Sequence, residues 1–150
     1  MTGEWILFEV EGVEYALPKA VVQQTLTAPA GLRGEVPYQG VLYRILDLRQ
    51  LFALPPSPAS ECQVVLVELG GERLALVADR LGGVRELDPA SGVALPWTYG
   101  GRERLWFSSL LLGEDERITV LVEPRGLLAS GRTLAAVSSA NPVPTQDRRG

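Results

Sequence analysis

The chain opens with two short apolar runs that have the character of β-strands. Residues 5–10 form the first run and residues 13–17 the second, and Glu11-Gly12 separates them. Every second residue from Ile6 to Val10 is apolar, and alternate strand side chains share one face. A two-residue connection that contains glycine suits a tight hairpin turn. The pattern therefore predicts a β-hairpin at the start of the chain.

The same pattern recurs later, with strands predicted over residues 63–69 and 72–78 around Gly70-Gly71. The segments EGVEYALPKAVV and GGERLALVADRL align at an offset of 59 residues, which takes Gly12 to Gly71. A hairpin signal repeated at this distance predicts two similar β-modules in one chain. The alternative is that the two segments share only the features common to all hairpins.

Residues 41–46 between the hairpins are β-branched or apolar and predict a further strand. Asp47 is placed to cap a short helical turn over residues 48–52. Prolines then dominate residues 54–58. Because proline lacks the backbone donor and fixes φ, we expect residues 53–61 to cross over between the two modules.

The second half of the chain predicts strands over residues 84–87, 105–112 and 118–122, a loop-rich stretch over 88–101, and a short helix from Pro124 to Leu128. Many short strands with Gly/Pro turns are typical of an all-β barrel architecture. Residues 1–140 are expected to form one domain. The last ten residues, 141–150, are polar and contain proline, so we expect a disordered tail.

Composition narrows the classes of function. The net charge of −4 argues against nucleic acid, which needs a Lys/Arg footprint. The chain has no histidine and a single cysteine, Cys62. These counts argue against the usual catalytic couples, a disulfide and a Cys-rich metal site, so neither enzyme activity nor a cofactor is expected. No signal peptide or apolar run of about 20 residues is present, which predicts a cytoplasmic protein without direct membrane insertion.

Four segments together resemble the CheW-like domain family of bacterial chemotaxis coupling proteins. The opening FEVEGVEYALP is similar to the family's first hairpin. The stretch from Gly34 to Gly40 followed by VLYRILDLR is similar to its signature, Gly-x-x-Asn-Leu-Arg-Gly and a strand ending in Asp-Leu-Arg. LALVADRLGGVREL carries Asp79 in the family's acidic position, and ITVLVEPRGLL ends in the family's Leu-Leu. The resemblance covers roughly residues 4–129.

This resemblance implies a fold of two SH3-like five-stranded β-barrels side by side, with short helices. It also implies a non-catalytic adaptor of chemosensory or motility signalling. Such an adaptor couples a methyl-accepting chemoreceptor to the regulatory domain of a CheA-type histidine kinase, in the cytoplasm at membrane-associated receptor arrays. The positions where the family contacts its partners, or which hold the contact loop, correspond here to Val22, Gln24, Gly34, Tyr38, Gln39, Gly40 and Arg49.

The signature departs from the family at three positions. Pro37 and Gln39 replace the family's Asn and Arg, and Arg44 replaces a proline in the next strand. Glutamine retains hydrogen-bonding capacity but lacks the charge and the fork of arginine. The departures therefore bear on the receptor contact more than on the fold.

Two other functions remain open at this point. A small-ligand-binding or hydrolytic β-barrel would use Asp47 and Asp79 as a carboxylate pair, which requires the two groups to lie a few ångströms apart. The repeat instead places Asp47 in the first module and Asp79 in the second, and capping or turn hydrogen bonds are the commoner role of such residues. Arg49 and Arg80 are candidates to pair with these carboxylates or with those of a partner. A homo-oligomeric structural protein is the third possibility.

Overall fold

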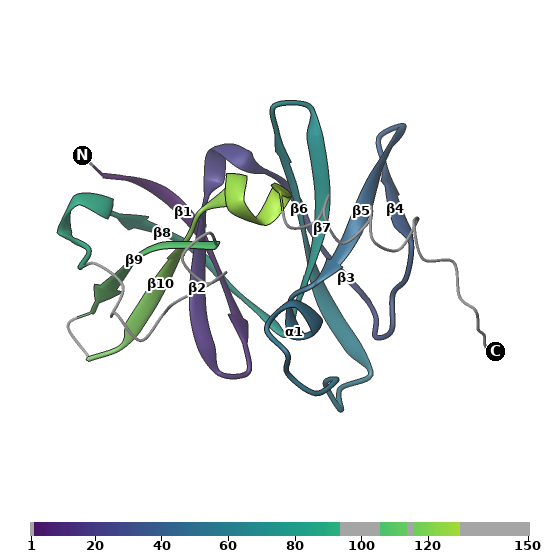
Figure 1. Cartoon of the computed structure of the whole chain (residues 1–150), viewed down its shortest axis with the longest axis horizontal. Coiled ribbons are helices and arrows are strands. Elements are labelled where there is room, and N and C mark those ends of the chain that lie inside the picture. Colours follow the sequence, from purple (N-terminus) through teal and green to yellow (C-terminus); the bar gives the residue numbers. More distant parts are fainter. Residues whose placement is uncertain (1, 94–105, 114–115, 130–150) are drawn as a thin grey trace.

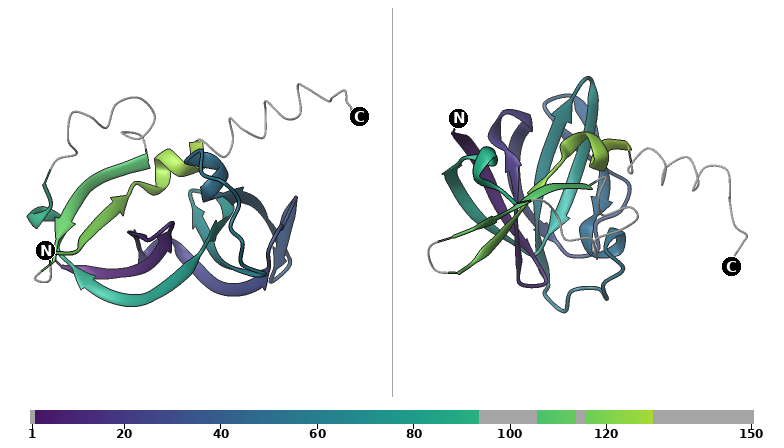
Figure 2. Two further views of the ribbon diagram at one scale, coloured as in Figure 1. Left: turned by 90° about the horizontal axis from the view of Figure 1, so that it is seen from below. Right: turned by 60° about the vertical axis from the view of Figure 1, so that its left-hand side comes forward.

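Two five-stranded β-sheets lie side by side in the computed structural model, which describes residues 2–93, 106–113 and 116–129 (Figure 1). The first sheet contains β1 (Gly3–Val10), β2 (Val13–Pro18), β8 (Arg80–Leu87), β9 (Phe107–Leu112) and β10 (Ile118–Val122), in the order β8-β1-β2-β10-β9. The second contains β3 (Val22–Pro29), β4 (Glu35–Tyr38), β5 (Val41–Asp47), β6 (Glu61–Leu69) and β7 (Glu72–Ala78), in the order β3-β6-β7-β5-β4. Each sheet curves around its own interior, and we call the two units the first and second barrel (Figure 2).

The helical elements are short. Among the residues that the structure describes, those with defined bounds are the 3-10 turns η1 (Lys19–Val21) and η2 (Pro89–Ser91), the helix α1 (Leu48–Leu51), and a helix over residues 124–129. The all-β class with short helices is confirmed. The strand bounds predicted for β7 and β10 coincide with those observed.

The two sheets repeat one topology. In each, a hairpin (β1–β2 or β6–β7) stands at the centre, and its second strand pairs in parallel with β10 or β5. That third strand pairs antiparallel with β9 or β4, and the first hairpin strand pairs antiparallel with β8 or β3. The repeated β-module predicted from the offset hairpins is therefore present.

The chain path differs from the prediction. The chain begins with β1 and β2 in the first barrel, forms all five strands of the second, and returns for β8, β9 and β10. It changes barrel at η1 and again at Asp79, between β7 and β8. Residues 52–60 connect α1 to β6, and the strands on both sides of this connection, β5 and β6, belong to the second sheet. The predicted crossover near 53–61 is therefore wrong, because prolines end regular structure without specifying the sheet that the next strand joins.

The largest apolar cluster lies between the two sheets and not inside either barrel. It joins one face of β1, β2 and β10 to the facing side of β6 and β7, with Phe8, Leu17, Val65 and Leu76 at most 1% exposed. Two smaller clusters fill the barrel interiors. Because the central strands are buried on both faces, their sequences are nearly continuous apolar runs. The two barrels therefore share one core.

Several edge elements were missed or mispredicted. Strands β3 and β4 were not predicted, and β8 begins at Arg80, four residues before the predicted start. β8 is mostly exposed, and a bulge opposite Leu7 and Phe8 interrupts its register at Gly82. Edge strands with glycine or proline lack the apolar alternation on which sequence prediction depends. The predicted tail over 141–150 lies outside the described residues, as do residues 94–105.

Candidate protein-binding site

A β-hairpin formed by β4 and β5 occupies the segment that carries the family signature. Gln39 and Gly40 connect the strands with φ angles of 50° and 81°. Positive φ at both central residues defines the tight turn that matches strand twist, and glycine adopts it without steric cost. Gly34, at φ 83°, precedes β4, and its carbonyl accepts a hydrogen bond from the Ile45 N–H at 3.0 Å. The contact loop expected between Gly34 and Gly40 is thus mostly strand.

Four of the predicted partner-binding residues come together at one end of the second barrel. Gln24 of β3 donates its side-chain N–H to the Tyr38 hydroxyl at 3.5 Å, which links the two edge strands of this sheet. The Tyr38 ring packs edge-on against Tyr43, with centroids 6.3 Å apart. Gln39 and Gly40 follow Tyr38 directly and are exposed. We call Gln24, Tyr38, Gln39 and Gly40 the hairpin patch.

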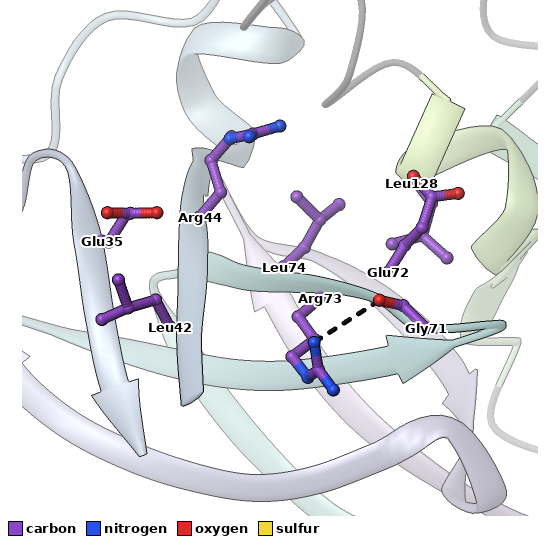
Figure 3. A pocket seen from close by; sticks show the side chains of 8 residues that line it. All are labelled: Glu35, Leu42, Arg44, Gly71, Glu72, Arg73, Leu74 and Leu128. Carbon is purple, nitrogen blue, oxygen red and sulfur yellow. Dashed lines mark hydrogen bonds between the residues drawn. The ribbon is translucent and has the colours of Figure 1, made fainter. Parts of the chain in front are cut away.

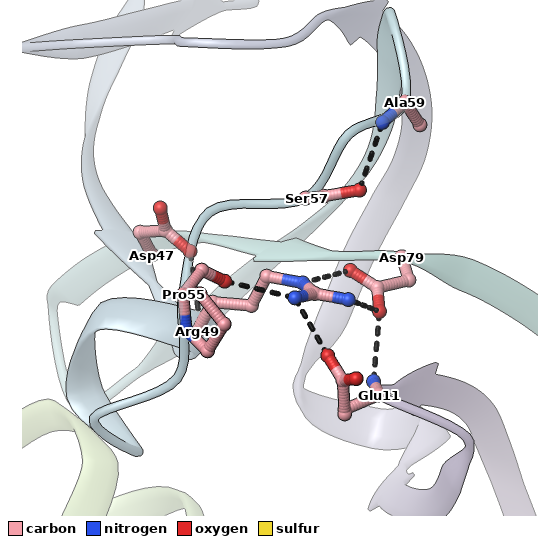
Figure 4. Close-up of polar contacts among 7 residues, drawn as sticks. All are labelled: Glu11, Asp47, Arg49, Pro55, Ser57, Ala59 and Asp79. Carbon is pink, nitrogen blue, oxygen red and sulfur yellow. Dashed lines mark hydrogen bonds and ion pairs between the residues drawn. The ribbon is translucent and has the colours of Figure 1, made fainter.

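Val22 and Arg49 have different surroundings. Val22, at the start of β3, is half-buried and packs against the core between the barrels. Arg49 lies on α1, and its guanidinium is directed to groups of this chain, as Figure 4 shows. The structure therefore does not place Arg49 in the hairpin patch.

The Arg49 guanidinium forms a clasp with Glu11 and Asp79 that joins the two barrels. Nε and one terminal nitrogen donate to the two oxygens of Asp79 at 2.8 and 2.7 Å. The other terminal nitrogen lies 2.7 Å from the carboxylate of Glu11 and donates to the Pro55 carbonyl at 2.8 Å. Glu11 belongs to the β1–β2 turn of the first barrel, whereas α1 follows β5 of the second. The clasp thus holds that turn against the point where the chain returns from the second barrel.

Hydrogen bonds set the ionisation of this clasp. The pKa of Asp79 is lowered, mainly by the hydrogen bond from Arg49, and the Glu11 N–H, which donates at 2.7 Å, lowers it further. The same Arg49–Asp79 bond raises the pKa of Arg49. Both groups are thus held in their charged forms. Of the possibilities that the sequence left open for Arg49, the structure shows pairing within the chain, with the carboxylate of Asp79.

The alternative carboxylate pair finds no support in these contacts. Asp47 accepts the Arg49 N–H at 3.0 Å and caps α1, which confirms the predicted cap. Asp79 is held ionised by Arg49, whereas a general acid needs a raised pKa. Asp47 ends β5 and Asp79 follows β7, so both belong to the second barrel, contrary to the division predicted from the repeat. Among the described residues, no group of three or more Cys, Asp or Glu side chains is arranged to hold a metal ion.

A surface pocket borders the outer side of the same hairpin (Figure 3). Its lining residues come from β4, β5, β7 and the helix over 124–129, and are Glu35, Leu42, Arg44, Gly71, Glu72, Arg73, Leu74 and Leu128. Leu42 is 57% exposed and contributes an apolar side chain to this surface. The sequence contained a signal for it, because Leu42 and Arg44 alternate with the inward-facing Tyr43 and Ile45. The outward direction of Leu42 could therefore have been predicted from the strand periodicity.

No helix within the described part of the chain has the length and apolarity needed to cross a membrane.

Comparison with known proteins matches this architecture to one family. The family model described as CheW-like domain matches residues 4–132, which is most of the chain. Among solved structures, the crystal structure of the scaffolding protein TtCheW from Thermoanaerobacter tengcongensis superposes with a TM-score of 0.69 at 15% sequence identity. The alignment covers 82% of this chain and 90% of that one, which confirms the predicted fold of two SH3-like barrels. No curated protein matches the chain in sequence. With the family model spanning both barrels and the signature hairpin, the chain belongs to the CheW-like domain family.

Proposed function

We propose that the chain is a non-catalytic adaptor of a bacterial chemosensory system. It couples a methyl-accepting chemoreceptor to the regulatory domain of a CheA-type histidine kinase by protein–protein docking, in the cytoplasm at receptor arrays. Membership of the CheW-like family supports this role, and a structural relative is itself described as a scaffolding protein. No cofactor takes part.

The observation that carries the proposal is the hairpin patch. Its tight turn has positive φ at both central residues, and the Gln24–Tyr38 hydrogen bond links the patch to the other edge strand of the sheet. A surface ordered before binding loses little conformational entropy when a partner docks. Tyr38 supplies an aromatic ring with a polar tip, and tyrosine is one of the residue types enriched at protein interfaces.

The departures from the family signature all lie on this hairpin. Pro37 and Arg44 are exposed on β4 and β5, and Gln39 forms the turn. Proline on an edge strand also removes a donor and blunts the edge against unwanted strand pairing. We infer that these positions tune which receptor or kinase is bound, while the fold is unaffected.

Binding measurements on variants of the turn test the proposal. Isothermal titration of the purified chain would use the regulatory domain of the kinase and a receptor tip fragment as two separate titrants. Gly40→Val introduces a β-branched residue at φ 81°, with no atom within 4 Å of the new Cβ, so the strain is confined to the turn. We expect affinity for one titrant to fall by about tenfold, the effect of losing one well-placed contact group.

The matched control is Gly31→Val. Gly31 precedes β4, at the opposite end of that strand from Gly40, has φ 86°, and likewise has no atom within 4 Å of the position that a Cβ would occupy. This variant should bind as the wild type does. Gln39→Arg restores the family's charged fork and should tighten the receptor contact. If neither titrant binds, the adaptor role is wrong; if both bind but neither turn variant alters affinity in a folded protein, the hairpin patch is not the interface.

A further inference from the structure

The outer face of the β4–β5 hairpin continues the sheet face that packs against the first barrel. Leu46 and Leu76 pair in register on this face and belong to the apolar cluster between the barrels. Two residues earlier on each strand, Arg44 pairs with Leu74 on the same face, because alternate strand side chains share one side. Leu42 comes two residues before Arg44 on that face and is 57% exposed. The face therefore passes along β5 from covered core to open surface.

The pocket in Figure 3 lies where this face opens, between the hairpin and the helix over 124–129. Leu74 and Leu128, which are 3% and 4% exposed, lie at its base, and Leu42 forms an exposed apolar wall. The volume of the pocket is about 280 Å³. Pockets that hold whole small-molecule ligands measure roughly 300–1,000 Å³, so this one suits single side chains of a protein.

Arg44 brings an unpaired positive charge to this pocket. Glu35 lies directly opposite Arg44 in the β4–β5 pair, but Figure 3 shows the guanidinium on the side of β5 where Leu74 and Leu128 lie and Glu35 on the other side. Within the described part of the chain, Arg44 forms neither an ion pair nor a hydrogen bond, and it is exposed. Arg73 differs, because it leaves β7 on the opposite side from Leu74 and forms an ion pair within its own hairpin.

We propose that this pocket binds a glutamate or aspartate side chain of a partner protein, in a segment whose neighbouring apolar side chain covers Leu42 and Leu74. The planar fork of Arg44 suits bidentate contact with a carboxylate. Since Arg44 replaces a proline of the family signature, the contact is a property of this chain.

Two observations favour a partner over a second copy of this chain. The pocket is continuous with the hairpin patch, because Leu42 follows Gly40 by two residues on the same hairpin. A two-fold contact would also set pocket against pocket and leave the base of both uncovered. The inference rests on the proposed adaptor function in naming the occupant as a signalling partner, and it adds the chemistry by which that partner is recognised.

Titration with small probes tests the pocket without any signalling protein. The ¹⁵N-labelled full chain is titrated at low salt with the peptide acetyl-Leu-Glu-Leu-amide and, as a matched neutral probe, acetyl-Leu-Gln-Leu-amide. We expect the glutamate peptide to shift the amide signals of Leu42, Leu74 and Leu128 and to bind about threefold more tightly, the effect of one exposed ion pair. This preference should disappear at about 1 M salt, which shortens the screening length to about 3 Å.

Variants of the chain complete the test. Arg44→Gln removes the charge and should abolish the preference for the glutamate peptide, while the glutamine peptide binds as before. The matched control is Arg33→Gln, at an exposed arginine between β3 and β4 that does not line the pocket. Leu42→Asn removes the exposed apolar wall and should weaken both peptides alike, with Val84→Asn, at a residue 51% exposed on the first barrel, as its control.

Equal binding of the two peptides to the wild type, shifts confined to other residues, or an unchanged preference in a folded Arg44→Gln protein would each overturn the proposal. A dilution series of the chain alone tests the other occupant: signals of Leu42 and Leu128 that move with protein concentration would identify a second copy in the pocket and would also overturn it. Because the kinase and receptor take no part, these outcomes are separate from failure of the adaptor role.

Discussion

Replacing Arg49 with methionine removes the guanidinium that joins the two barrels and keeps an unbranched side chain. In the wild type this group donates to both oxygens of Asp79, to Glu11 and to the Pro55 carbonyl. Of the hydrogen bonds that Asp79 accepts from Arg49 and Glu11, the variant keeps only that from the Glu11 N–H. The Asp79 carboxylate, whose side chain is 20% exposed, then lacks a compensating positive charge. The energetic cost comes mainly from that uncompensated charge.

The size of the effect follows from burial. Removing one partner of a fully buried ion pair costs about 3–5 kcal/mol. Arg49 is 12% exposed and Asp79 20%, so the pair lies toward the lower end of that range. Glu11 is 51% exposed, and its contact with Arg49 adds little because solvent screens it. We expect a loss of about 2–4 kcal/mol, which for a chain of this size lowers Tm by roughly 5–15 °C. Arg49→Lys should lose about half as much, since it retains a charge but not the fork.

Urea unfolding followed by circular dichroism measures this loss. The matched control is Arg73→Met: Arg73 meets Glu68 through one contact of 3.1 Å, its side chain is 34% exposed, and both residues belong to one hairpin. That variant should cost less than about 1 kcal/mol. A double-mutant cycle of Arg49→Met with Asp79→Asn should give a coupling energy above about 1 kcal/mol. Equal losses for the two arginine variants, or an additive cycle, would refute the clasp.

Four shorter predictions concern other parts of the molecule. Since Arg49 lowers the pKa of Asp79 in the folded protein, the stabilisation it gives is complete above the unfolded-state pKa of about 4 and is lost as pH falls through the lower folded-state pKa. The unfolding free energy of the wild type should therefore approach that of Asp79→Asn in acid, and a gap that stays constant with pH would contradict this. Gln39→Asn should gain about 0.5–1 kcal/mol in urea unfolding, because asparagine tolerates the φ of 50° better, and a loss would be inconsistent with that turn. Leu66→Ala, at a residue with no exposed surface, should cost about 2–5 kcal/mol against less than about 0.5 for Leu42→Ala, and similar losses would contradict the assigned burial. Truncation after Ala140 should leave Tm within about 2 °C, as the polar, proline-containing sequence of the last ten residues predicts, and a larger fall would show that the tail packs on the domain.

The parts of the fold that were predictable are those buried on one or both faces. The β6–β7 hairpin and β10 consist of mainly apolar runs bounded by glycine or charged turns. Their strand structure could therefore be predicted from the sequence. β3 differs because its sequence is largely polar. It begins with Val22-Gln23-Gln24-Thr25, a pattern typical of a loop between elements. Its strand structure depends on pairing with β6, a contact between residues about 40 apart in the chain. Tertiary pairing of this kind leaves no local periodicity.

The site was predictable to a similar extent. The four residues of the hairpin patch were named from the family resemblance, and the structure adds a hydrogen bond between Gln24 and Tyr38 that links the two edge strands. The residues alone left open whether Arg49 pairs within the chain or with a partner, because Asp79 is 30 positions away and only the return of the chain to the first barrel brings them together. The burial of Glu14 was not predicted. An acidic residue in a strand otherwise reads as exposed, and its burial depends on Thr119, 105 positions later.

The chain path connects the two barrels structurally. The first barrel is built from both ends of the domain, whereas the second is the continuous segment between them, and the apolar cluster between the barrels contains more residues than either interior. The clasp of Arg49 with Glu11 and Asp79 stands at the return crossing, where a hinge would otherwise be easiest to form. The shared core and the clasp therefore hold the second barrel, which carries the hairpin patch, against the first. For the adaptor role proposed above, this arrangement means that the orientation of the hairpin patch is set by contacts that involve both barrels.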